Sequence, residues 1–269
     1  MYKYASMMKF TKERESIIAM VKPIYFFIFC LLVSLPSHAT ELVDTLKKVK
    51  PAVVAIGISN PTGSPRIRLI GSGFVVSPGN RVVTNYHVIA NPLDESKLEQ
   101  YVVLSGQGTV LKVHKITEQR HAPAYDLALL SISGQLPALT VSKAALVAEG
   151  TPVAFTGFPI TQVLGLYPAT HSGIIAAHTP IAIPVENSRD LKLAMLKQLD
   201  KPYLVYQLDA VAYPGNSGSA LYRHDNGEVI GIINQVYIKT SREAVLSDPS
   251  GISYAIPSQH LLDLMQQAN

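Results

Sequence analysis

The residues that could do chemistry centre on Ser217, which stands in the stretch Pro-Gly-Asn-Ser-Gly-Ser at 214–219. Glycines on both sides let the backbone adopt turn conformations closed to other residues and approach a substrate closely. Such a turn can also direct successive backbone N–H groups into one concavity, as a developing oxyanion requires. The stretch predicts that Ser217 is a nucleophile. Gly, Asn and Ser are also common turn formers, so the prediction needs a base and an acid elsewhere in the chain.

Two side chains supply such a base and acid. His87 lies in the apolar run 82–89, and imidazole is well suited to moving a proton near neutral pH. Asp126 heads the apolar run 127–130, where a carboxylate drawn toward the core needs a partner such as an imidazole N–H. Taken singly, each is equally well read as a satisfied polar residue or a turn residue. Together, in the order His, Asp, Ser, they predict a site for nucleophilic catalysis.

The first 39 residues are typical of a secretory signal peptide. Five cations and two acids precede a short apolar run at 24–33, and the small residues around 37–39 suit cleavage after Ala39. We therefore expect a periplasmic or secreted protein. The alternative is an uncleaved membrane anchor, although the apolar run is shorter than the roughly 20 residues that a spanning helix needs.

Cleavage would change the charge and the thiol content. The formal net charge is +4, and loss of five cations and two acids lowers it to about +1, which provides no electrostatic reason to expect nucleic acid or an anionic membrane as partner. The only cysteine, Cys30, lies in the leader, so the mature chain would hold no disulfide and no cysteine nucleophile. The remaining histidines show no spacing that suggests a metal site. We expect no metal and no cofactor.

The rest of the chain reads as mostly β-structure. A short amphipathic helix is predicted at 40–50 and another at 258–267. Between them, many short β-rich runs are separated by Gly, Pro, Asn and Ser, which favours an all-β barrel or sandwich. The expected strands are 53–58, 73–76, 81–84, 101–104, 110–113, 152–155, 173–176, 204–207, 229–233 and 252–256. Residues 188–201 have a helical pattern and are interpreted as an insertion, either a packed helix or a mobile lid.

These motifs resemble one protein family. The order His, Asp, Ser is similar to that of the chymotrypsin-fold serine proteases. The local sequences around His87, Asp126 and Ser217, with Gly-Glu-Val-Ile-Gly-Ile at 227–232 and Tyr-Ala-Ile-Pro at 254–257, look most like the HtrA/Deg branch. The resemblance covers about residues 42–264.

The resemblance implies a fold and a set of roles. It implies two antiparallel β-barrels of six strands each, a first of about 51–140 and a second of about 145–256, within a peptidase domain of 40–269. The site would lie between the barrels. His87 would act as general base, Asp126 would hold the imidazole, and the N–H groups of Gly215 and Ser217 would form the oxyanion hole.

Departures from the family pattern concern specificity. Val211 stands six residues before the nucleophile, where trypsin-like members place an acid, so cleavage after Lys or Arg is not expected. The pocket wall is expected near Ile233, Asn234, Gln235 and Val236, which favours small or aliphatic residues in the substrate. Ser219 replaces a glycine that is usual in the branch. Many relatives also carry a PDZ domain, and we expect no regulation through such a module here.

The sequence thus predicts an exported serine endopeptidase that cleaves polypeptides through an acyl-enzyme intermediate. Its expected partner is a polypeptide substrate, with no nucleic acid and no membrane for the mature form. Two alternatives stay open: a catalytically silent member of the fold that binds peptides or acts as a chaperone, and an esterase that uses the same three side chains.

Overall fold

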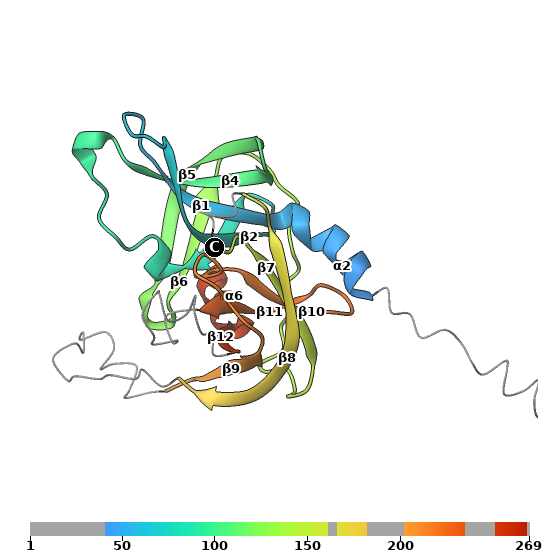
Figure 1. Ribbon diagram of the computed structural model, residues 1–269. Helices are drawn as coiled ribbons and strands as arrows, with labels where there is room; N and C mark the ends of the chain where they lie inside the picture. Colours follow the sequence, from blue (N-terminus) through green and yellow to red (C-terminus); the bar gives the residue numbers. More distant parts are fainter. Residues whose placement is uncertain (1–40, 161–165, 182–201, 235–250, 268–269) are drawn as a thin grey trace, which may run out of the picture. The chain divides into compact units, whose positions relative to one another are not determined.

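The structure is a computed structural model that describes residues 41–160, 166–181, 202–234 and 251–267 (Figure 1). The predicted signal peptide at 1–39 and the predicted helical insertion at 188–201 lie outside the described residues. In the described part of the chain, no helix is both long enough and apolar enough to cross a membrane.

The first half of the chain forms a closed antiparallel barrel. β-branched residues prefer extended backbone, and turn residues separate the runs in which they gather. The strands follow one another around the barrel in the order β1-β2-β3-β6-β5-β4. Their bounds are β1 (Val53–Ser59), β2 (Ile67–Val76), β3 (Arg81–Asn85), β4 (Gln100–Gln107), β5 (Val110–Ala122) and β6 (Leu127–Ile132).

The second half repeats this arrangement. Read from β7, its closed barrel has the order β7-β8-β9-β12-β11-β10, which is the order of the first barrel. Its strands are β7 (Pro152–Gly157), β8 (Ala169–Pro180), β9 (Leu204–Asp209), β10 (Ala220–Arg223), β11 (Val229–Asn234) and β12 (Ile252–Pro257). The prediction of two six-stranded antiparallel barrels is confirmed.

Helices flank the barrels at both ends of the described chain. Helix α2 (Glu41–Val49) runs into a 3-10 turn at Lys50–Ala52 and then into β1, and α6 (Ser258–Gln266) follows β12 directly. Thr45 of α2 is buried and donates a hydrogen bond of 2.8 Å to the carbonyl of His224, beyond β10. Helix α2 is therefore attached to the second barrel as well as leading into the first.

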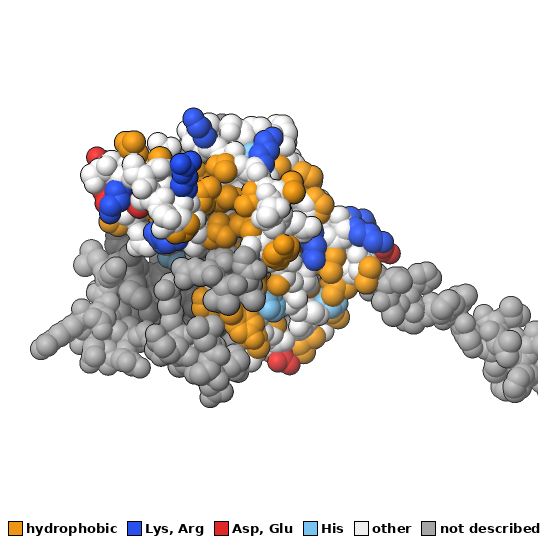
Figure 2. Space-filling view, turned by 45° about the horizontal axis from the view of Figure 1, so that its top comes forward, with side chains coloured by type: hydrophobic (Ala, Val, Ile, Leu, Met, Phe, Trp, Pro, Cys, Tyr) orange, Lys and Arg blue, Asp and Glu red, His pale blue; other side chains and the backbone are white. Residues whose placement is uncertain are grey.

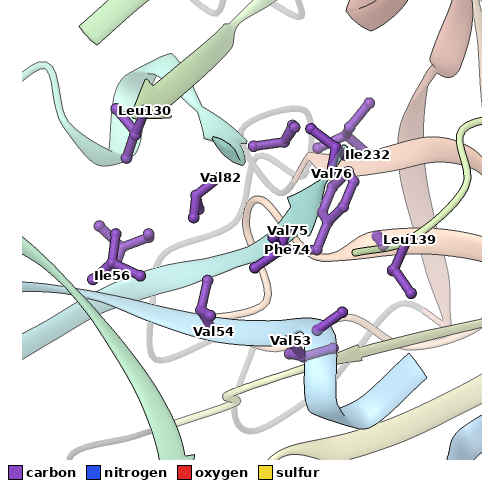
Figure 3. Close-up of a cluster of buried hydrophobic side chains, with 14 of the residues drawn as sticks. Val53, Val54, Ile56, Phe74, Val75, Val76, Val82, Leu130, Leu139 and Ile232 are labelled. Atoms are coloured by element: carbon purple, nitrogen blue, oxygen red, sulfur yellow. The ribbon is translucent and has the colours of Figure 1, made fainter. Parts of the chain in front are cut away.

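The core of the first barrel continues into the contact between the barrels. Buried residues of β1 and β2, including Val54, Phe74 and Val76, belong to the same apolar cluster as Ile232 of β11 (Figure 3). The segment between the barrels adds two isolated bridges, Val76 to Leu139 and Val141 to Val229. A second cluster, which includes Phe155 and Tyr206, fills the second barrel. The barrels are thus joined by shared apolar packing.

The outer surface also carries apolar side chains. Val110 on β5 is 80 % exposed. The face of the molecule drawn in Figure 2 shows hydrophobic side chains among polar ones. Scattered exposed apolar residues are normal in folded proteins.

The buried His260 makes the free energy of unfolding depend on pH. His260 of α6 stacks on Tyr125, with ring centroids 4.0 Å apart, and its Nδ1 is buried with no hydrogen-bond partner among the described residues. Burial lowers the pKa of His260 below its ordinary value of 6.5, although Asp263 opposes the shift. The unfolded chain therefore binds the proton more readily than the folded one, and the stability present above pH 6.5 decreases as the pH falls below it.

We expect His260→Phe, which keeps an aromatic ring on Tyr125, to reduce the loss of unfolding free energy between pH 7.5 and pH 5.5. Urea unfolding at the two pH values measures this loss. Gln266→Ala, at an exposed position of the same helix, is the control, and its pH dependence should match that of the unmodified protein. A His260→Phe variant with unaltered pH dependence would contradict the prediction.

Candidate active site

The register of two strands brings His87 and Asp126 together. Asn85 at the end of β3 pairs with Leu127 at the start of β6, so the residues just outside these two positions meet at one end of the sheet. His87 lies there in a 3-10 turn, Tyr86–Val88, and Asp126 follows a second 3-10 turn, Pro123–Tyr125. The Tyr86 N–H donates to the Asp126 carbonyl at 3.0 Å, which ties the two turns to each other.

The carboxylate of Asp126 accepts hydrogen bonds from both barrels. His87 donates to it from its backbone N–H, 2.8 Å from Oδ1, and its ring Nδ1 lies 2.6 Å from Oδ2. Asn234, at the end of β11, donates from Nδ2 to Oδ2 at 2.8 Å. The Asp126 side chain is only 15 % exposed, so these donors replace water around the charge. With Nδ1–H directed at the carboxylate, the lone pair of the imidazole is left on Nε2.

Ser217 lies against the strands that lead to His87. Its carbonyl accepts a hydrogen bond of 2.9 Å from the N–H of Ser72 on β2. A Cβ at Gly71 would lie 2.8 Å from Val88, the residue after His87, and 3.4 Å from the Ser217 carbonyl oxygen. Gly71 is therefore a common neighbour of two segments: residues 214–219, here called the serine loop, and the 3-10 turn Tyr86–Val88 that holds His87.

A glycine permits this close approach. Gly218 has φ +87°, and a Cβ there would collide with the Ser72 carbonyl and the Thr84 hydroxyl of the first barrel. The Gly218 N–H donates to the Ile233 carbonyl at 3.0 Å. The serine loop is thus held between β2 and β3 on one side and β11 on the other. Among the described residues, no hydrogen bond joins the Ser217 hydroxyl to His87. Such bonds are often long without substrate.

Two backbone N–H groups of the serine loop, those of Gly215 and Ser217, have no acceptor among the residues that the structure describes. The Pro214 carbonyl accepts a hydrogen bond of 2.7 Å from the Ile160 N–H. Because N–H and C=O point in opposite directions in a trans peptide, the Gly215 N–H points away from Ile160. Within the described part of the chain, neither this N–H nor that of Ser217 has an acceptor. Unpaired donors of this kind suit a ligand oxygen that carries negative charge.

The residues expected to line a specificity pocket have different environments. Val211 is half-buried, Ile233 is fully buried, and Asn234 is 1 % exposed. Asn234 was expected in a pocket wall, which stays a prediction; in the structure its amide donates to the Asp126 carboxylate. Gln235 and Val236 lie outside the described residues. The contact of Asn234 was not foreseen from the sequence, because nothing local connects the end of β11 with Asp126.

Ser219, the departure from the family pattern, is fully buried, and its hydroxyl has no partner among the described residues. Within the same described ranges, no group of three or more His, Cys, Asp or Glu side chains could hold a metal ion.

The two barrels and the His87–Asp126 pair between them define the class of trypsin-like peptidase folds. The sequence model of the trypsin-like peptidase domain matches residues 71–232, and this chain belongs to that family. Serine protease HTRA1B of Danio rerio is 30 % identical over 240 residues, which cover 88 % of this chain and 43 % of the relative. The "Probable periplasmic serine endoprotease DegP-like" of Halomonas elongata is 28 % identical over 74 % of this chain and 35 % of its own length.

Solved structures of HtrA type are also similar. The HtrA-type protease AlgW with tripeptide is 26 % identical, with a TM-score of 0.59 over 84 % of this chain and 62 % of the other. The active form of the Rv3671c protease from M. tuberculosis has a TM-score of 0.61 over 87 % of each chain, and at 21 % identity it shows the fold alone. The chain spans less than half the length of the curated relatives named above.

The amide of Asn234 provides a test of the site's construction. Asn234→Leu keeps the number and branching of the side-chain heavy atoms and removes the donor, so a largely buried carboxylate loses one partner. We expect the free energy of unfolding to fall by about 1–3 kcal/mol, measured by urea denaturation. Asn226→Leu, at an exposed turn where Oδ1 accepts from the Glu228 N–H, should change it by about 0.5 kcal/mol or less. Equal losses in the two variants would contradict the role of Asn234.

Proposed function

We propose that this protein is a serine endopeptidase that hydrolyses peptide bonds of polypeptides through an acyl-enzyme intermediate. The observation that carries the proposal is the His87–Asp126 pair beside a serine loop whose Gly215 and Ser217 N–H groups have no acceptor in the described ranges. Membership in the trypsin-like peptidase family supports it, as do relatives named as serine proteases.

In the proposed first half-reaction, the Ser217 hydroxyl attacks the carbonyl carbon of the scissile bond. His87 accepts the hydroxyl proton at Nε2, and Asp126 keeps Nδ1–H directed at its carboxylate and stabilises the imidazolium that forms. The carbonyl oxygen becomes an oxyanion and accepts hydrogen bonds from the N–H groups of Gly215 and Ser217. Collapse of this intermediate breaks the C–N bond, and His87 returns the proton to the leaving amine.

In the proposed second half-reaction, water replaces the amine. His87 removes a proton from the water while its oxygen attacks the acyl carbon, and the same two N–H groups hold the oxyanion. The ester bond to Ser217 then breaks, and the serine regains a proton from His87. Besides the substrate and one water molecule, the proposed cycle is described by side chains and backbone groups of this chain.

Replacement of the nucleophile tests the proposal. Ser217→Ala is expected to lower kcat by about 10⁴-fold or more, because no other group forms the acyl-enzyme. Hydrolysis of a casein-like protein and labelling by a fluorophosphonate should both be lost. An active Ser217→Ala variant would refute Ser217 as nucleophile. An unmodified protein that takes no label would indicate a silent binding member of the fold, and one that cleaves simple esters but no protein would indicate an esterase.

We further propose a preference for small or aliphatic residues on the amino side of the cleaved bond. Support comes from Val211, which supplies an apolar side chain where trypsin-like members have an acid, and which is half-buried six residues before Ser217. Cleavage of a peptide library should return Ala, Val or related residues at this position. Enrichment of Lys or Arg would contradict the proposal.

We also propose that the protein is exported to the periplasm or secreted, after cleavage near Ala39. Support comes from the basic and apolar pattern of residues 1–39, and from similarity to a relative named as periplasmic. The proposed partners are polypeptide substrates.

A further inference from the structure

Ser72 of β2 is the point at which the first barrel holds the serine loop. It stands between Gly71 and Gly73 and is fully buried. Its N–H donates to the Ser217 carbonyl at 2.9 Å, and its own carbonyl accepts from the Thr84 hydroxyl at 2.8 Å. Both backbone groups are thus engaged, so the position of the side chain relative to the loop is well determined.

The hydroxyl of Ser72 connects two backbone groups of the second barrel. It donates to the Gly215 carbonyl at 2.6 Å and accepts from the Phe158 N–H at 2.8 Å. A hydroxyl has a single hydrogen to donate, so the donation to Gly215 fixes its orientation. Phe158 follows the end of β7, and Gly215 lies two residues before the nucleophile. The side chain therefore links β2, the exit of β7 and the serine loop.

The backbone at Gly215 needs such a support. Its φ is +101°, in a region where glycine alone is unstrained, and glycine has few intrinsic restraints on rotation. A Cβ there would collide with the Phe158 carbonyl, so no side chain can stabilise the turn from within. The peptide before Gly215 is held by the Ile160 N–H at the Pro214 carbonyl. The peptide after Gly215 is held by Ser72 at the Gly215 carbonyl.

Three polar side chains, those of Ser72, Asn216 and Ser219, lie nearest to the position of a Cβ at Gly157, and of these three only Ser72 has a hydrogen-bond partner among the described residues. A Cβ at Gly157 would lie 2.7 Å from Ser72 Oγ and 3.0 Å from Asn216 Oδ1, and would collide with Ser219 Oγ. Asn216 and Ser219 are buried with no partner for their side-chain polar atoms. The three side chains are therefore not equivalent, because the hydrogen bonds to the Gly215 carbonyl and from the Phe158 N–H are both made by the Ser72 hydroxyl.

We propose that Ser72 is a positioning residue of the oxyanion hole. By holding the peptide after Gly215 at its carbonyl, Ser72 restricts rotation of the backbone at Gly215 and keeps the Gly215 N–H, which belongs to the preceding peptide, facing the substrate carbonyl. The inference rests on the proposed function and deepens it. It assigns the geometry of the hole to a side chain of the first barrel, although the donors themselves belong to the second. Ser72 touches no reacting atom and acts through the backbone of Gly215.

The test compares two deletions of a buried hydroxyl. Ser72→Ala removes the hydroxyl that joins Gly215 and Phe158, whereas Ser219→Ala removes one that has no partner. We expect Ser72→Ala to lower kcat on a peptide substrate by about 10–100-fold, since a small displacement of a catalytic group can cost about 10²-fold. KM should stay within about twofold and the shape of the pH profile should be unchanged, because His87 and Asp126 are untouched. Ser219→Ala should stay within about twofold in kcat.

A readout besides activity addresses the hydrogen bonds themselves. Amide hydrogen exchange of Phe158 should become faster in Ser72→Ala and not in Ser219→Ala, because the Phe158 N–H loses its acceptor in the first variant alone. Binding of a peptide boronate, which forms a tetrahedral adduct with Ser217, should weaken by a factor similar to the loss in kcat. Binding of a non-covalent product peptide should be nearly unchanged.

Several outcomes separate the claims. Should Ser72→Ala fold poorly, Ser72→Cys keeps a side chain of similar size with a weak donor, and a loss of kcat in the same direction is expected. Wild-type kcat in Ser72→Ala or Ser72→Cys, or an increase in KM alone, overturns the positioning role. An inactive unmodified protein overturns the proposed function instead, and the exchange experiment still shows whether Ser72 holds the loop.

Discussion

The contact between β2 and the serine loop is the constraint on which the site depends. Each barrel is a closed sheet, and β2 pairs with β3 only from Phe74 onward, so the N–H of Ser72 within β2 is available to the serine loop of the second barrel. Ser72 makes this contact possible by bonding to both Ser217 and Gly215. Glycines at 71 and 218 remove the side chains that would hold the two surfaces apart. Shared apolar packing around Phe74 and Ile232 then excludes water from the same boundary.

The second constraint is the charge of Asp126. A carboxylate that is largely withdrawn from water has to be surrounded by donors, and here they come from a turn of the first barrel and from a strand of the second. The same bonds that satisfy the charge also orient the His87 ring. Stability of the barrel contact and orientation of the imidazole therefore depend on one set of hydrogen bonds.

Much of the fold was predictable from local patterns. Short β-branched runs separated by turn residues mark most of the strands, and the helices at both ends follow the expected apolar spacing. The structure extends some strands beyond the predicted runs: β8 spans Ala169–Pro180, whereas the predicted run was 173–176. Strand length depends on pairing with neighbours, which a local pattern does not contain. The contact of His87 with Asp126 was also expected, because the order His, Asp, Ser in this sequence is the order found in chymotrypsin-fold serine proteases.

By itself, the sequence determined the chemical groups at hand, their order, the β-rich class of the fold and the family resemblance, since each depends on residues close together along the chain. Only the tertiary structure decided that Asn234 contacts Asp126, 108 residues away, and that Ser72 bonds to Gly215, 143 residues away. It also decided which N–H groups of the loop lack acceptors. The physical reason is that a hydrogen bond requires two groups to meet in space at a defined angle, and closure of the two barrels brings these groups together.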